Sequence, residues 1–147
     1  MDADGLMLQQ RTTPSRRSVL RMAALVAALG DSNSDAAAKA EVLLIRYYGS
    51  RATEFLIAAT NDPNPEVRFR AVWILGKSRD PRAFESILKL TKDSDPRVRY
   101  DAAIALGIHG DDRAISYLTE LARTPDPDSS VDSAAVMGLS HLSVHEK

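Results

Sequence analysis

The segment PEVRFRAVWILGKSRDPRAFESILKLTKD, residues 65–93, returns in altered form as PRVRYDAAIALGIHGDDRAISYLTELART, residues 96–124. The two copies are offset by 31 residues (98 − 67 = 31). Self-similarity at a fixed period is the signature of a repeat architecture, and it changes how every other motif is interpreted. The coinciding positions are Val67/Val98, Arg68/Arg99, Ala71/Ala102, Leu75/Leu106, Gly76/Gly107, Asp80/Asp111, Arg82/Arg113, Ala83/Ala114 and Leu90/Leu121.

Each copy contains two stretches with helical spacing of apolar residues. Val67, Ala71 and Leu75 form one stripe, and Ile87 and Leu90 lie on a second one beyond the turn GKSRD. Each unit is therefore predicted to be a helical hairpin. We expect Asp80 and Asp111 to cap the second helix, and Gly76 and Gly107 to end the first.

Weaker copies lie on both sides of this pair. Upstream, Ala36, Ala40 and Leu44 match the first stripe; downstream, Val131 and Leu139 continue it at an offset of 33 (131 − 98 = 33). A single hairpin cannot bury its apolar stripe, so neighbouring hairpins must stack. The sequence predicts an all-α solenoid of stacked helical hairpins over residues 15–142, with about four units of which the terminal ones are imperfect. Residues 1–14 would form an N-terminal arm and residues 143–147 a C-terminal tail.

The segment DSDPRVRYDAAIALGIHGDDRAISYLTEL, residues 93–121, carries the pattern D-x-D/N-P-x-V-R-x-x-A, followed by A-L-G and a shorter second helix. It closely resembles the HEAT-like repeats of the family named for phycobilisome lyases. The resemblance covers roughly residues 31–142. It implies a fold more than a function, because such repeats mainly supply binding surface.

Composition limits the possible functions. The chain has 147 residues, 19 basic and 20 acidic side chains, and a formal charge of −1. No overall field would hold it on nucleic acid. It has no cysteine for disulfides or thiolate metal sites, and its longest apolar run, residues 22–29, is too short to span a membrane.

Two rows of arginines recur at the repeat period. Arg68 and Arg99 follow Asp62 and Asp93 by six residues, and we expect them to form a structural ladder with aspartates of the inter-repeat turns. Asp132 replaces the arginine in the last unit, which predicts that this ladder ends there. The second row opens each second helix; it would form salt bridges along one edge of the array or offer donors to an acidic partner, and it comprises Arg51, Arg82 and Arg113.

The candidate partner-binding site is an apolar stripe made of Phe69, Trp73, Tyr100 and Ile104. At 100° per residue, these side chains lie opposite the core-facing stripe of their helices. The first helices are expected on the convex side of the array, so the stripe would form an exposed patch of a kind that soluble monomers seldom leave unused. The alternative is that neighbouring helices or the N-terminal arm partly cover it.

No catalytic, cofactor-binding or metal-binding residues are predicted. His109, His141 and His145 lack ligand spacing on one helical face, and HEAT-repeat iron hydroxylases use several His-Glu pairs whereas this chain has His145-Glu146 alone. We therefore predict a non-catalytic protein-interaction scaffold without cofactors, which could also self-associate through its incomplete last repeat. The family resemblance implies an alternative, a lyase-like or chaperone-like subunit that acts on a chromophore-bearing protein together with a partner subunit.

The segment SRRSVLRMAALVAALGDSNSDAAAKA, residues 15–40, has two interpretations. Its arginine pair and apolar run resemble a twin-arginine export signal with cleavage after Ala38 or Ala40. Yet Asp31 lies one period before Asp62, and Leu25 aligns with Leu56. Because a signal peptide has no reason to keep this register, we favour a helix over residues 19–29 and a cytoplasmic protein.

Overall fold

The computed structural model describes residues 13–127 and 130–144, and the regular elements within them are helices. The α-helices are α2 (Arg16–Ala28), α3 (Ser34–Leu43), α4 (Thr53–Ala59), α5 (Pro65–Ser78), α6 (Phe84–Leu90), α7 (Pro96–His109), α8 (Ala114–Arg123) and α9 (Val131–Ser143). Short π- and 3₁₀-helical turns, η1 (Leu44–Tyr48), η2 (Gly49–Ala52) and η3 (Pro81–Ala83), lie within two of the hairpins.

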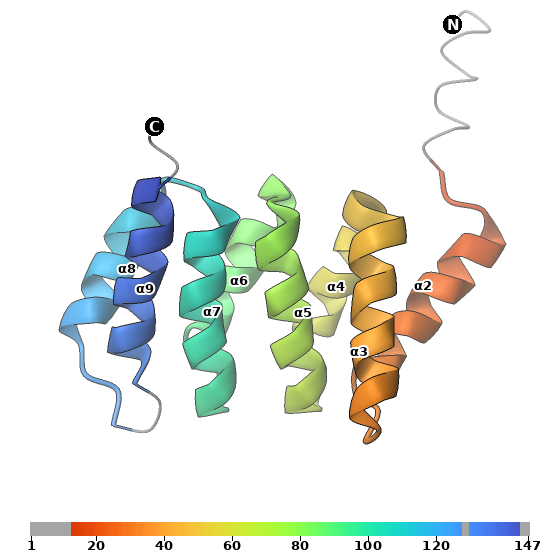
Figure 1. The fold of residues 1–147 in the computed structure, drawn as a ribbon, viewed down its shortest axis with the longest axis horizontal. Coiled ribbons are helices and arrows are strands. Elements are labelled where there is room, and N and C mark those ends of the chain that lie inside the picture. Colours follow the sequence, from red (N-terminus) through yellow and green to blue (C-terminus); the bar gives the residue numbers. More distant parts are fainter. Residues whose placement is uncertain (1–12, 128–129, 145–147) are drawn as a thin grey trace, which may run out of the picture.

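The helices form two rows that run along the molecule (Figure 1). One row contains α3, α5, α7 and α9, and the other contains α2, α4, α6 and α8. Three hairpins, α3–α4, α5–α6 and α7–α8, are thus flanked by a single helix at each end. The predicted all-α solenoid with imperfect terminal units is confirmed.

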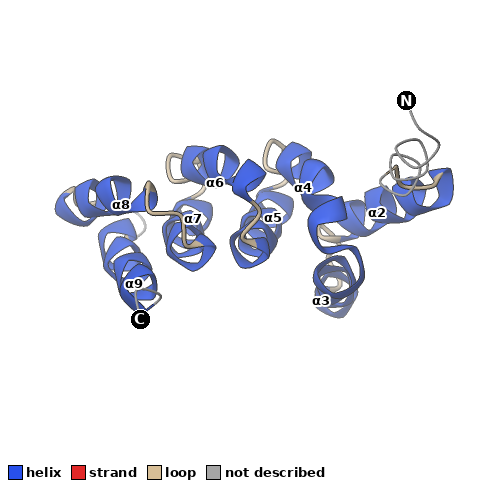
Figure 2. Cartoon of the chain, turned by 90° about the horizontal axis from the view of Figure 1, so that it is seen from above, coloured by secondary structure: helices blue, strands red, loops and turns tan. Residues whose placement is uncertain are grey.

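The array is curved, and the row of first helices lies on the inside of the curve (Figure 2). The expectation that these helices form the convex side is therefore wrong. The physical reason is their close approach. A Cβ atom on Gly76 of α5 would lie 2.9 Å from the Cβ of Ala105, and one on Gly107 of α7 would overlap the backbone of Gly138 in α9. Small residues let the inner row pack more closely than the outer one.

This packing also corrects the predicted role of both glycines as helix ends. Gly76 and Gly107 lie inside α5 and α7, which continue to Ser78 and His109. The left-handed residues that end these helices are Arg79, with φ 52°, and Gly110, with φ 81°. The recurring glycine is required by the contact between helices and not by chain reversal.

The core follows the predicted repeat register. Leu44, Leu75 and Leu106, one period apart, are fully buried, and so are Ile87 and Leu118 of the second helices. Burial of such side chains from each unit is the main source of stability in a stacked array.

The segment with two interpretations belongs to this core. Residues 16–28 form α2, Ser15 caps its start by accepting a hydrogen bond from the Ser18 amide, and Met22 and Leu29 are fully buried. The helix thus begins three residues before the predicted boundary and includes the arginine pair. Ala38 and Ala40 lie inside α3, so cleavage there would cut a helix of the array. None of the helices in residues 13–127 and 130–144 is long and apolar enough to cross a membrane.

Candidate functional site

The predicted partner-binding stripe lies on the inner row of helices, but it is less exposed than expected. Phe69, Trp73 and Tyr100 are half-buried, and Ile104 is only 8% exposed. The close packing of α5 against α7 explains this burial, because it brings the side chains of neighbouring helices over one another. The predicted stripe is thus partly covered by adjacent helices.

The same stripe continues beyond the four predicted residues onto the helices at both ends of the row. Val42 of α3 stands one period before Trp73 (73 − 42 = 31), and Met137 of α9 follows Ile104 at the longer offset (137 − 104 = 33). Val42 is 54% exposed and Met137 46% exposed. The Tyr100 hydroxyl contacts the Met137 sulfur at 3.8 Å, so the row is continuous from α7 to α9. We call these six residues, Val42, Phe69, Trp73, Tyr100, Ile104 and Met137, the inner stripe.

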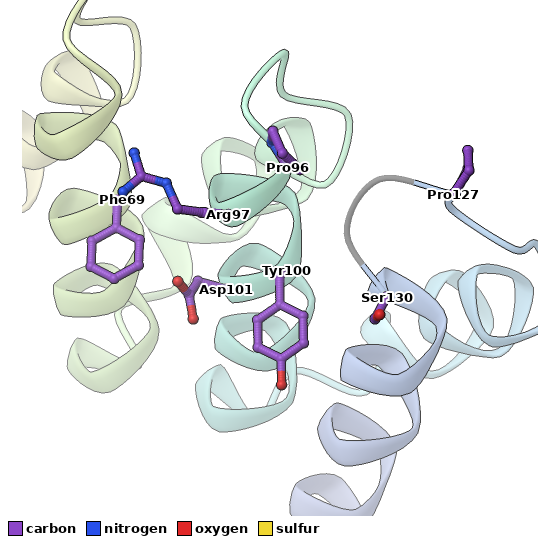
Figure 3. Close-up of a pocket in the computed structure, with 7 residues that line it drawn as sticks. All are labelled: Phe69, Pro96, Arg97, Tyr100, Asp101, Pro127 and Ser130. Atoms are coloured by element: carbon purple, nitrogen blue, oxygen red, sulfur yellow. The ribbon is translucent and has the colours of Figure 1, made fainter.

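An open pocket of about 530 Å³ extends along the inner stripe from α5 across α7 to the loop before α9. Phe69 and Tyr100 line it together with Asp101, and Figure 3 shows the Asp101 carboxylate between the two rings. Arg97 lies at its upper end in that view, and Pro96, Pro127 and Ser130 complete the lining.

Asp101, which lies within α7, differs from the aspartates of the repeat turns. It is half-buried, and the described residues provide it with neither a hydrogen bond nor an ion pair. Burial raises the pKa of the Asp101 carboxyl, and the positive charge of Arg97 opposes this effect. Asp95 and Asp111, by contrast, bond to the arginine two residues later, and both have a lowered pKa.

The predicted structural ladder joins the repeats through bidentate ion pairs. Arg68 donates Nε and Nη2 to the two carboxylate oxygens of Asp93, both at 2.8 Å, and Nη1 to the Asp62 carbonyl at 2.8 Å. Arg99 repeats this geometry with the Asp93 carbonyl at 2.9 Å and with Asp126 at 2.7 and 3.1 Å. Each arginine thus binds the backbone of its own turn and the carboxylate of the next.

Asp126 was not identified from the sequence. Its unit follows at an offset of 33 residues instead of 31, so the register that places Asp93 after Asp62 does not reach it. The available signal in the sequence was the presence of aspartates in the last inter-repeat loop, which could pair with Arg99.

The second arginine row forms the edge salt bridges that were one of its two predicted roles, at two of its three positions. Arg82 bonds to Asp80 at 2.6 Å and to Glu54 of the preceding unit at 3.1 Å, and Arg113 bonds to Asp111 at 2.8 Å and to Glu85 at 3.3 Å.

Arg51 differs from the other members of this row because Gly49 stands where they have an aspartate. Its guanidinium donates to the Tyr47 carbonyl at 2.7 Å and lies 5.9 Å from the centre of the Tyr48 ring. The described residues place no carboxylate in contact with it.

His109 and His141 lie on different helices and differ in exposure. His109 is buried at the end of α7, where Nε2 meets the Asp80 carbonyl at 2.8 Å, and His141 is exposed on α9. His145 and Glu146 lie outside the described residues. Within residues 13–127 and 130–144, no group of three or more histidine or acidic side chains could hold a metal ion.

The comparisons with known proteins agree with this fold. No curated protein matches the chain in sequence. Among solved structures, human deoxyhypusine hydroxylase in complex with glycerol is similar, with a TM-score of 0.67 and 23% identity over 85% of this chain. The alignment covers 44% of that enzyme's chain, so at this identity it shows a shared fold. The family model for HEAT repeats matches residues 52–140, more than half of the chain. The protein therefore belongs to the HEAT repeat family.

Proposed function

We propose that the protein is a non-catalytic scaffold that binds a protein partner on its inner stripe. One observation carries the proposal: apolar side chains recur at equivalent positions of the four helices of the inner row, α3, α5, α7 and α9, and they range from buried Ile104 to half-exposed Val42 and Met137. Val42 and Met137 are about half exposed at the two ends of this row. A contiguous apolar patch on a folded protein is typical of an interaction surface.

The ionic groups of the same face support binding to a protein. Arg70 is paired with Glu41 at 3.1 Å, and the Lys77 ammonium lies 4.6 Å from the centre of the Trp73 ring. These cations are held by groups of the chain itself, which favours a protein partner over nucleic acid. It combines an apolar centre with a polar rim, as protein interfaces do.

The test is photo-crosslinking in the cells that produce the protein. A benzophenone amino acid at Val42 or Met137 should give discrete adducts of higher mass. The control is the same group at Ile115 or Tyr117 of α8, which are 42% and 48% exposed but lie on the outer row. Adducts that form equally from both rows, or from neither, would contradict the proposal.

The finer resemblance to phycobilisome-lyase repeats, the lyase-like role that it implies and the cytoplasmic location remain predictions. The lyase-like role requires a tetrapyrrole and a partner subunit. A shift in bilin absorbance on mixing with the protein and a candidate subunit would favour it over the scaffold.

A further inference from the structure

We propose that the pocket lined by Phe69, Tyr100 and Asp101 binds an arginine side chain of the protein partner, with the guanidinium between the two rings and its N–H groups on the Asp101 carboxylate. The inference rests on the proposed function and specifies the chemistry of the partner. Three features of the pocket carry it.

The first feature is the state of Asp101. A half-buried carboxylate without a hydrogen-bond donor loses hydration and gains nothing in return. The raised pKa of this carboxyl has the same cause, since burial disfavours the ionised form. A bound cation would supply the missing partner and stabilise the ionised form.

The second feature is that the nearest cation is already occupied. Arg97 donates to Glu66 at 2.8 Å and to Asp95 at 3.3 Å, so its guanidinium is held at the rim and does not bond to Asp101. Among the residues that the structure describes, none donates a hydrogen bond to Asp101, so this lining carboxylate can accept a donor from outside.

The third feature is the aromatic pair. Phe69 and Tyr100 occupy the same position in successive repeats and line the pocket on either side of Asp101 (Figure 3). Aromatic faces attract cations, and a planar guanidinium can stack on a ring while it donates two parallel N–H groups to one carboxylate. An ammonium cannot do both, which favours arginine over lysine.

The experiment uses the full chain and an acetylated, amidated Gly-Arg-Gly tripeptide, followed by ¹⁵N NMR titration. We expect saturable shifts of the amides around residues 69, 100 and 101. The matched probe is the same tripeptide with citrulline, which keeps the shape and removes the charge. It should bind at least tenfold more weakly, about the effect of one hydrogen bond to a charged group.

Two variants locate the site. Asp101→Asn should weaken binding of the arginine tripeptide roughly tenfold, and Phe69→Leu, which keeps apolar volume but removes the ring, should weaken it several-fold. Glu120→Gln on the outer face of α8 is the control and should leave binding unchanged. Unchanged melting temperatures would show that the variants remain folded.

Equal binding of the arginine and citrulline tripeptides, wild-type affinity in Asp101→Asn, or no saturable shift would each overturn the inference. Its failure is distinguishable from that of the proposed function. If crosslinks form at Val42 and Met137 but the tripeptide does not bind, the scaffold stands and the arginine pocket fails. If the tripeptide binds but the inner row gives no crosslinks, the pocket stands and the scaffold fails.

Discussion

Asp80 shows how one residue can join two repeats. Its buried carboxylate accepts hydrogen bonds from Thr53 of the preceding unit at 2.9 Å, and from the side chain and amide of Arg82. The hydrogen bonds from Arg82 are the main cause of the lowered pKa of Asp80, and that from Thr53 adds to the effect. Because the folded state prefers the ionised carboxylate, these contacts stabilise the protein above the ordinary pKa of 3.8 and lose their effect as the pH falls through the lower, folded value.

We therefore expect Asp80→Asn to lower the free energy of unfolding by about 2 kcal/mol at neutral pH. Urea denaturation of wild type and variant should show the difference narrowing below about pH 4, because Asp80 of the unfolded wild-type chain becomes protonated there while the folded carboxylate stays ionised. Asp112→Asn, at an exposed position in the next turn, is the control and should change little. A difference that stays constant down to pH 2 would contradict the assignment.

Two arginines, Arg68 and Arg97, both connect α5 with the following repeat unit. We expect the more buried ion pair to contribute more to the free energy of unfolding. The Arg68–Asp93 pair is bidentate with side chains 12% and 8% exposed, whereas Arg97 and Glu66 are 59% and 44% exposed. Arg68→Lys should lower the free energy of unfolding by about 2 kcal/mol, since an ammonium cannot form the bidentate pair with the Asp93 carboxylate. Arg97→Lys should cost less than about 0.5 kcal/mol. Equal losses in thermal denaturation would show that the geometry of the buried pair contributes nothing.

The sequence predicted that Arg68 would be held by an aspartate of a turn, because the arginine recurs at the edge of a buried stripe. It did not predict which turn, since the partner of each arginine lies 25 to 27 residues further along the chain. The sequence also did not indicate that Asp101 has no hydrogen-bond donor among the described residues. Arg70 stands at the equivalent position one unit earlier, so periodicity did not mark Asp101, and the absence of a donor emerges only from the packing of α5 and α7.

Gly107 determines how closely α7 and α9 pack. A Cβ at this position would overlap the Gly138 backbone, which cannot move away without shifting α9. Gly107→Ala should therefore cost about 3 kcal/mol, the upper range for overpacking a core. The sequence-based interpretation of Gly107 as a helix end predicts a much smaller loss.

The control is Gly110→Ala in the turn after α7. Its φ of 81° strains an alanine, but no atom lies closer than 3.9 Å to the added Cβ. That variant should lose only about 1 kcal/mol. If chemical denaturation gives both variants the same loss, close helix packing is not what Gly107 provides.

The first hairpin shows an irregularity that the repeat register does not reveal. Its first helix ends in the π-helical turn η1. The residue with positive φ that follows is Gly49, with φ 47°, one residue later than Arg79 in the next unit (79 − 31 = 48). A wider turn accommodates one more helical residue within an unchanged period. Length and apolar spacing are the same in both units, so periodicity predicts the same geometry for both.

At the scale of the molecule, stacking was predictable and curvature was not. Apolar residues at a constant offset require each hairpin to pack on the next, whatever the detailed angles. Curvature depends on the relative spacing of the two rows, which follows from single small residues such as Ala105 and Gly138 at contact points. A pattern of apolar positions contains no information on that spacing, and the convex assignment failed for this reason.

The helix α9 lies at one end of the array and presents an exposed apolar residue on its outer side. Val136 stands at the position of Val72 and Ala103 (103 − 72 = 31; 136 − 103 = 33), which are fully buried against the following helix, yet Val136 is 58% exposed. Of the apolar residues of this last repeat that the sequence suggests as exposed, Met137 is 46% exposed, whereas Val131 is buried and Leu139 is half-buried. Val136 is thus the better marker of a stacking surface that the described residues leave open.

We expect this surface to mediate self-association, because stacking of a further helix on it would bury the same apolar position that α5 and α7 bury. Sedimentation velocity of the full chain should show a concentration-dependent dimer that Val136→Lys weakens at least tenfold, since a lysine there would lose its hydration in the interface. Ile115→Lys on α8, which replaces a side chain of similar exposure outside this surface, should leave the dimer intact. A wild-type chain that remains monomeric at the highest concentration, or a dimer that both variants weaken equally, would show that α9 does not stack on a second copy.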